Sequence, residues 1–162
     1  NMTDAMAALT ALVNTDCPER EPALARFHRR WRHEALVLDK WFAVQAMSRL
    51  PDTLARVRSL TQHPDFDARN PNRLRALVGS FCHYNPVRFH AADGGGYALL
   101  ADQVLMLDPL NPQVASRLTR AFDRWRKYDE TRQTHARTAL ERIRDHAGLS
   151  KDVTEVVTRA LG

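Results

Sequence analysis

The segment NPQVASR, residues 111–117, carries an amide and a guanidinium at a spacing that places both on one side of a helix. Asn111 can cap such a helix and Pro112 fits its first turn, so Gln113 and Arg117, which are four residues apart, share a face. The apolar residues that form a stripe beside them are Val114, Leu118, Phe122 and Trp125. Gln113 and Arg117 therefore lie at the edge of a buried stripe, where they are either ordinary surface or side chains that face a cavity.

The guanidinium of Arg117 suits the binding of a carboxylate or of peptide carbonyl groups, because it can donate two parallel hydrogen bonds. We expect Arg117 in the first two turns of its helix, close to the N-terminus, where the helix dipole opposes a positive charge. A cation at that position costs some stability. Such a cost is easier to explain if the residue binds a ligand.

A zinc site is the next chemistry to consider, because HEALV, residues 33–37, begins like the H-E-x-x-H motif. Val37 occupies the position that the second histidine needs, so the ligand pair is incomplete. The remaining histidines show no paired spacing; they are His28, His63, His83, His90, His135 and His146. From spacing alone we expect no metal site, no catalytic residue and no cofactor in this chain.

The glycine run DGGG, residues 93–96, precedes an expected helix and could in principle cradle a phosphate. It lacks the lysine of a P-loop and the preceding strand of a dinucleotide fold. A tight turn that needs a positive φ angle is the favoured interpretation.

Composition and charge are typical of a globular protein: 162 residues, 44% hydrophobic and 27% charged. The net charge of +5 raises the question of nucleic-acid binding, but the arginines are spread among acidic residues, which favours solvated helix faces and no nucleic-acid partner. No apolar run reaches membrane-spanning length, and no signal peptide opens the chain. Two cysteines, Cys17 and Cys82, are too few for a disulfide framework and indicate a reducing compartment, so we expect a cytoplasmic protein without a membrane partner.

Almost every segment has helical periodicity, and we expect about nine helices joined by short loops that contain proline. The expected N-terminal capping or opening residues are Thr3, Asp52, Asn70, Asn111, Asp129 and Ser150. Further helices are expected near 24–31, 34–47 and 97–108, and Gly148 is expected to end the helix that begins after Asp129. Short loops and the recurrence of Asn-Pro at 70–71, 85–86 and 111–112 favour stacked helix pairs. The predicted fold class is all-α, a superhelical stack of antiparallel helix pairs of the armadillo or HEAT kind, forming one domain over 1–162.

Several collinear segments resemble the C-terminal helical domain of bacterial aminopeptidase N, a family of zinc metallo-aminopeptidases. They are NMTDAMAAL (1–9), LVLDKWF (36–42), NPNRLRALVGSF (70–81), NPVRFHAADGGGY (85–97), NPQVASRL (111–118) and KYDETRQ (127–133). Each segment is a modest signal, but together they cover essentially the whole chain in order.

The resemblance implies a terminal domain that closes over a separate catalytic domain of the same polypeptide and restricts which peptides enter the chamber. The family's H-E-x-x-H zinc motif and its G-A-M-E-N motif are both missing here, so zinc is implied for the full-length enzyme and this chain alone is expected to be inactive. By the same resemblance Gln113, Arg117 and Arg75 face the chamber and contact the peptide substrate.

Two other hypotheses remain open on the sequence alone. The chain is also compatible with a free-standing helical-repeat module that binds a protein partner, and its net charge with a nucleic-acid binder. An H-E-x-x-H motif upstream in a longer reading frame would favour the aminopeptidase. A steep salt dependence of binding to random duplex DNA would favour the last hypothesis.

Overall fold

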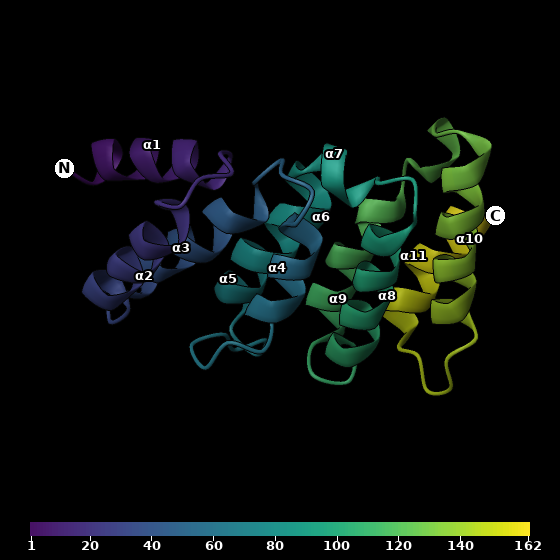
Figure 1. Cartoon of the computed structure of the whole chain (residues 1–162). Helices are drawn as coiled ribbons and strands as arrows, with labels where there is room; N and C mark the ends of the chain where they lie inside the picture. The colour runs from purple at the N-terminus through teal and green to yellow at the C-terminus, as the bar shows by residue number, and fades with distance from the viewer. The chain divides into compact units, whose positions relative to one another are not determined.

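The computed structural model describes every residue from Asn1 to Gly162, and all of its regular elements are helical (Figure 1). The chain forms two compact units, residues 1–88 and 89–162. No helix is both long enough and apolar enough to span a membrane. The predicted all-α class is therefore confirmed.

The first unit is organised around one central helix. Its elements are α1 (Met2–Val13), α2 (Arg20–Trp31), α3 (Ala35–Ala46), α4 (Thr53–Leu60), α5 (Pro71–Leu74), the π-helical turn η1 (Arg75–Gly79), α6 (Ser80–Tyr84) and most of α7 (Pro86–Phe89). Helix α3 packs against α1, α2, α4 and η1. Its Phe42 is fully buried, and the indole nitrogen of Trp41 donates a hydrogen bond to the carbonyl of Leu24 at 2.9 Å, which joins α3 to α2.

The second unit is built from four α-helices and two short 3-10 turns. Its elements are α8 (Gly95–Leu107), α9 (Pro112–Thr119), the 3-10 turns η2 (Arg120–Phe122) and η3 (Trp125–Lys127), α10 (Glu130–Arg144) and α11 (Lys151–Leu161). Consecutive helices pack against each other, α8 against α9 and α10 against α11, and α11 also packs against α9. The fully buried side chains of Leu100, Leu140 and Ile143 belong to this core.

The nine predicted helices are all present, with one addition and one interruption. The addition is the short α7, which follows Asn85-Pro86. The segment from Pro71 to Tyr84 is one continuous helical run, but a π-helical turn interrupts its α-helical hydrogen bonding at Arg75–Gly79. A single extra residue in one turn produces such a segment, and hydrophobic spacing does not reveal it.

Four of the predicted N-caps are confirmed by hydrogen bonds from the capping side chain. Asn70, Asn111, Asp129 and Ser150 accept from backbone amides of the first turn of α5, α9, α10 and α11. The prediction for Thr3 is wrong, because Asn1 caps α1 by accepting from the amide of Asp4 at 2.9 Å, and Thr3 lies inside the first turn.

Two other predicted helix ends differ in detail. Asp52 is the N-cap residue of α4, but its side chain makes no capping bond and pairs with Arg20 at 2.6 Å instead. Helix α10 ends at Arg144, four residues before the expected Gly148, which has a φ of 81° in the loop that follows.

Candidate functional site

Helix α9 presents Gln113 and Arg117 on its exposed side. The side-chain oxygen of Asn111 accepts from the amide of Val114 at 3.2 Å, and Pro112 occupies the first turn, so the helix begins where the sequence predicts. The opposite side is buried through Ala115, Leu118 and Thr119, and the stripe continues through Phe122 and Trp125. Gln113 and Arg117 therefore share one face, as predicted, but this face lies opposite the buried side of α9 and not at its edge.

Neither Gln113 nor Arg117 uses its side chain to stabilise the fold. Both residues are exposed, and neither side chain takes part in a hydrogen bond, an ion pair or a ring contact in this structure. An exposed guanidinium and amide on one face, without partners in their own chain, have their hydrogen-bonding capacity available for a ligand.

The expected effect of the helix dipole on Arg117 is wrong in sign. Helix α9 has only eight residues, and Arg117 lies in its last turn. The negative end of the dipole therefore favours the guanidinium instead of opposing it. The charge of Arg117 is therefore not destabilising at this position, and what suits the residue to binding is its exposed, unpartnered side chain.

Arg75, the third residue expected to contact the substrate, belongs to the first unit. It is the first residue of the π-helical turn η1 and is exposed. Its Nη2 donates a hydrogen bond of 3.3 Å to the side-chain oxygen of Asn72. This contact orients the guanidinium but leaves most of its five donors unused.

The glycine run at 93–96 is a tight turn, as predicted. Gly94 has a φ of 77°, and the carboxylate of Asp93 accepts from the amide of Gly95 at 2.8 Å. A Cβ atom at Gly96 would lie 2.1 Å from the carbonyl oxygen of Phe89, so this position requires glycine. The run brings the start of α8 close to the preceding backbone.

Beside this turn, His90 is held in a network within the second unit. Its Nδ1 lies 2.6 Å from the hydroxyl of Tyr97, its ring stacks on Tyr128 at 3.9 Å, and its carbonyl accepts from Arg132. Burial, with a smaller effect of the Arg132 charge, lowers the pKa of His90 to about 4. The imidazole is therefore neutral at pH 7, and its hydrogen bond with the Tyr97 hydroxyl is a structural contact.

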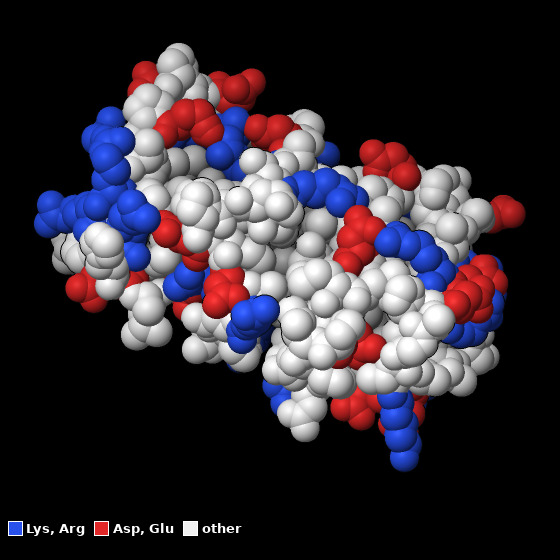
Figure 2. Space-filling model, turned by 90° about the horizontal axis from the view of Figure 1, so that it is seen from below, with Lys and Arg blue, Asp and Glu red and all other residues white.

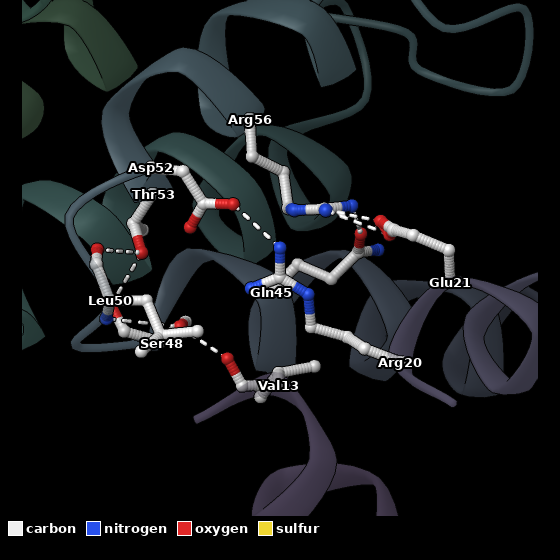
Figure 3. Close-up of polar contacts among 9 residues, drawn as sticks. All are labelled: Val13, Arg20, Glu21, Gln45, Ser48, Leu50, Asp52, Thr53 and Arg56. Atoms are coloured by element: carbon white, nitrogen blue, oxygen red, sulfur yellow. Dashed lines mark hydrogen bonds and ion pairs between the residues drawn. The ribbon is translucent and has the colours of Figure 1, made fainter. Parts of the chain in front are cut away.

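A cluster of polar contacts in the first unit joins α2, α3 and α4 (Figure 3). Gln45 is buried, donates to the carbonyl of Trp41 at 3.0 Å and accepts from Nη1 of Arg56 at 3.2 Å. Arg56 also pairs with Glu21. These contacts satisfy a buried amide and connect three helices, so we assign the cluster to stability.

The same close-up shows how the end of α3 is fixed to α1 and α4 (Figure 3). The buried hydroxyl of Ser48 donates to the carbonyl of Val13 at 2.5 Å. The hydroxyl of Thr53 lies 2.8 Å from the carbonyls of Ser48 and Leu50. This second set of contacts is also structural.

Sequence spacing missed one constellation of chemistry-bearing residues. His28 on α2, and His63 and Asp65 in the loop after α4, have ligand atoms that all lie within 4.8 Å of one another. Burial and then the charge of His28 lower the pKa of His63. Burial raises the pKa of Asp65, but its contacts with His28 and Arg32 outweigh this and lower it overall. No sequence signal links these residues, because 35 residues separate the two histidines.

Basic and acidic side chains are interspersed over most of the face drawn in Figure 2. Several arginines pair with carboxylates in their own unit, such as Arg20 with Asp52 at 2.6 Å and Arg144 with Asp145 at 2.8 Å. This pattern is typical of solvated helix faces.

Comparison with known families gives a match over the whole chain, residues 1–162, to the family described as "Domain of unknown function (DUF3458_C) ARM repeats". The chain belongs to this ARM-repeat family. The chain is 51% identical to aminopeptidase N of Caulobacter vibrioides over 162 residues. This alignment covers 100% of this chain and 19% of that protein. It is 45% identical to aminopeptidase N of Escherichia coli over 99% of this chain and 18% of that protein.

A solved structure extends the similarity to three dimensions. The crystal structure of Legionella pneumophila aminopeptidase A in complex with aspartic acid matches with a TM-score of 0.94 and 39% identity, over 99% of this chain and 19% of that chain. The chain therefore spans about a fifth of the length of these relatives and corresponds to the C-terminal helical domain of aminopeptidase N-like proteins.

Proposed function

We propose that this chain is the non-catalytic C-terminal domain of a zinc-dependent aminopeptidase that removes N-terminal amino acids from peptides. In this proposal the domain closes the active-site chamber and contacts the part of the peptide beyond the scissile bond. The observation that carries the proposal is that the whole of this chain matches part of aminopeptidase N proteins. That match favours a domain of an enzyme over a free-standing interaction module.

Gln113 and Arg117 are the proposed contacts on α9, and Arg75 is the proposed contact on η1. Support comes from the exposed position of all three and from the absence of partners for the first two side chains. A guanidinium can donate to a peptide carboxylate or to carbonyls, and an amide can both donate and accept. On α9, the amide of Gln113 and the guanidinium of Arg117 therefore suit an extended peptide, whose backbone offers both donors and acceptors.

The proposed partners are the peptide substrate and the catalytic domain of the same polypeptide. This chain contains no H-E-x-x-H motif, so the catalytic zinc is expected in the remainder of the protein. The free thiols of Cys17 and Cys82 support a reducing, cytoplasmic location.

The test is Arg117→Ala in the full-length enzyme, assayed on a peptide and on a short aminoacyl amide. A peptide reaches past the scissile bond toward the guanidinium, whereas the amide substrate offers nothing there. A charge-assisted hydrogen bond is worth about 1.5–3 kcal/mol, so we expect kcat/KM for the peptide to fall by about ten- to a hundred-fold. Gln113→Ala should act in the same direction with a smaller loss, because its hydrogen bond is neutral.

Arg124→Ala is the matched control, since Arg124 is also exposed and has no partner in the structure. It removes the same charge outside the proposed contact face and should leave the ratio of the two substrates unchanged. Equal losses for both substrates in Arg117→Ala, or the same change in selectivity in Arg124→Ala, would refute the proposed contact.

A further inference from the structure

Two histidines and one aspartate from separate parts of the first unit converge beside α2. His28 lies on α2, whereas His63 and Asp65 lie in the loop between α4 and α5. Their ligand atoms lie within 4.8 Å of one another, and all three residues are partly buried. Imidazole nitrogen and carboxylate oxygen are the donors that zinc uses in three-ligand sites.

The present contacts show what an ion would have to replace. Nε2 of His28 lies 2.6 Å from Oδ2 of Asp65, so a hydrogen bond joins two of the three ligand groups. Nδ1 of His63 accepts a hydrogen bond of 3.0 Å from the amide of Asp65. Metal binding commonly displaces protons from its ligands, and here it would displace the proton between His28 and Asp65.

The required movements are small. Two ligands of a tetrahedral zinc ion stand about 3.3 Å apart, given bonds of about 2.0 Å. The contact between His28 and Asp65 must therefore open from 2.6 Å. The most distant ligand atoms, at up to 4.8 Å, must approach each other. Two of the ligands lie in one loop, so they can move together without disturbing a helix.

Room for a water ligand is available on one side of the cluster. A cavity of about 400 Å³ is lined by His28, His63, Trp41 and Gln45, among others. An ion held by three protein ligands needs such an open position to complete a four-coordinate shell.

Nearby arginines oppose the binding of a dication. Arg32 donates to Oδ1 of Asp65 at 3.1 Å, and Arg29 lines the cavity. Arg73 donates to the carbonyl of Asp65 at 2.6 Å, but it is also paired with Asp39. Affinity is therefore expected to be lower than in structural sites with four ligands, and Arg32 is the main competitor.

We propose that His28, His63 and Asp65 form a three-ligand site for a divalent transition-metal ion such as Zn²⁺, completed by water. The bound ion links the loop at 61–70 to α2. Because it binds the folded state, it stabilises the first unit in proportion to its concentration. This site is independent of the catalytic zinc of the proposed function, since all its ligands belong to this chain.

The experiment is a Zn²⁺ titration of the 162-residue chain by calorimetry, with the melting temperature measured in the same samples. We expect one ion per chain and a melting temperature that rises with Zn²⁺. His28→Ala, His63→Ala and Asp65→Asn should each weaken binding by about tenfold or more. His146→Ala, which removes an exposed histidine from the second unit, should bind as the unchanged chain does.

Arg32→Ala distinguishes a real site from a folding defect. Removing the competing cation should tighten Zn²⁺ binding by about three- to tenfold, an effect that misfolding does not produce. Circular dichroism without metal shows whether each ligand variant is folded. The proposal is overturned if the chain binds no stoichiometric Zn²⁺, if binding survives in folded His28→Ala and His63→Ala, or if Arg32→Ala leaves the affinity unchanged or lower.

Discussion

Asn85 tests how the first unit is held together, because replacing its side-chain nitrogen by oxygen turns a hydrogen-bond donor into an acceptor. The residue is 3% exposed. Its Nδ2 donates to the carbonyl of Ala46 at 2.9 Å and to that of Ser48 at 2.7 Å, and its Oδ1 accepts from the amide of Arg88 at 3.3 Å. The substitution Asn85→Asp replaces the donor by an oxygen that faces two carbonyl oxygens.

The cost follows from the groups left unpaired. At pH 7 the variant loses two hydrogen bonds, each worth about 1 kcal/mol, and brings a buried carboxylate against carbonyl dipoles, so we expect a loss of about 3–5 kcal/mol. Burial and the two carbonyls raise the pKa of the new carboxyl in the folded state above its unfolded value of about 3.9. The charged form is thus disfavoured on folding, and the extra loss grows as pH rises through about 4.

The assay is urea unfolding at pH 4 and pH 7, with the unchanged chain measured in parallel so that other titrating groups cancel. The deficit of Asn85→Asp should shrink to about 1–2 kcal/mol at pH 4, where the protonated carboxyl can donate one bond again. Asn72→Asp is the control, because Asn72 is exposed and accepts from Arg75, so a carboxylate keeps that contact. The reasoning is refuted if Asn85→Asp unfolds at pH 7 with the same free energy as the unchanged chain. It is also refuted if the loss of free energy is the same at pH 4 and pH 7.

Three further substitutions, all in the second unit, are tested by their effect on the free energy of unfolding. Asn111→Ala removes the cap of α9 and should cost about 1 kcal/mol; no measurable loss would mean that the cap is unimportant. His90 has a folded pKa of about 4, below the unfolded 6.5, so stability is lost as pH falls from 6.5 toward 4. His90→Gln removes this titrating group. Between pH 7 and pH 5 the unchanged chain should therefore lose about 1 kcal/mol more unfolding free energy than His90→Gln does, allowing for solvent around the half-buried ring. The same pH dependence in both proteins would contradict this. Gly96→Ala places a Cβ 2.1 Å from the carbonyl oxygen of Phe89 and should cost about 2 kcal/mol or more. Gly79→Ala in the first unit is the control, because its Cβ would lie no nearer than 3.4 Å to another atom and should not cause such a loss. Equal losses in the two variants would contradict the close approach at Gly96.

The features of the fold that could be predicted are those set by residues close in sequence. Asn111 and Pro112 determine the start of α9 through local hydrogen bonding and a fixed φ angle, and the structure agrees. The spacing of Leu118 and Phe122 likewise identifies the buried side of this segment. Gln113 was expected at the edge of this buried side, but it lies on the exposed side opposite to it.

The features that could not be predicted depend on where a helix ends or on contacts between distant residues. The expected effect of the helix dipole on Arg117 is wrong, because α9 ends at Thr119 and a 3-10 turn follows, which places Arg117 in the last turn. His28, His63 and Asp65 meet only because the loop after α4 returns to α2. No periodicity in the sequence records such a return.

The last turn of α11 has a consequence for hydrogen exchange. The final carbonyls of a helix have no partner within the helix, and terminal turns therefore fray. Here the indole nitrogen of Trp125 donates to the carbonyl of Ala160 at 2.9 Å, and Nη2 of Arg126 donates to that of Leu161 at 2.8 Å. The guanidinium groups of Arg126 and Arg137 also lie 4.7 and 4.9 Å from the centre of the Trp125 ring. Side chains outside α11 therefore hold its last turn in place through hydrogen bonds to its final carbonyls. The backbone amides of this turn should exchange with solvent at rates typical of the middle of a helix.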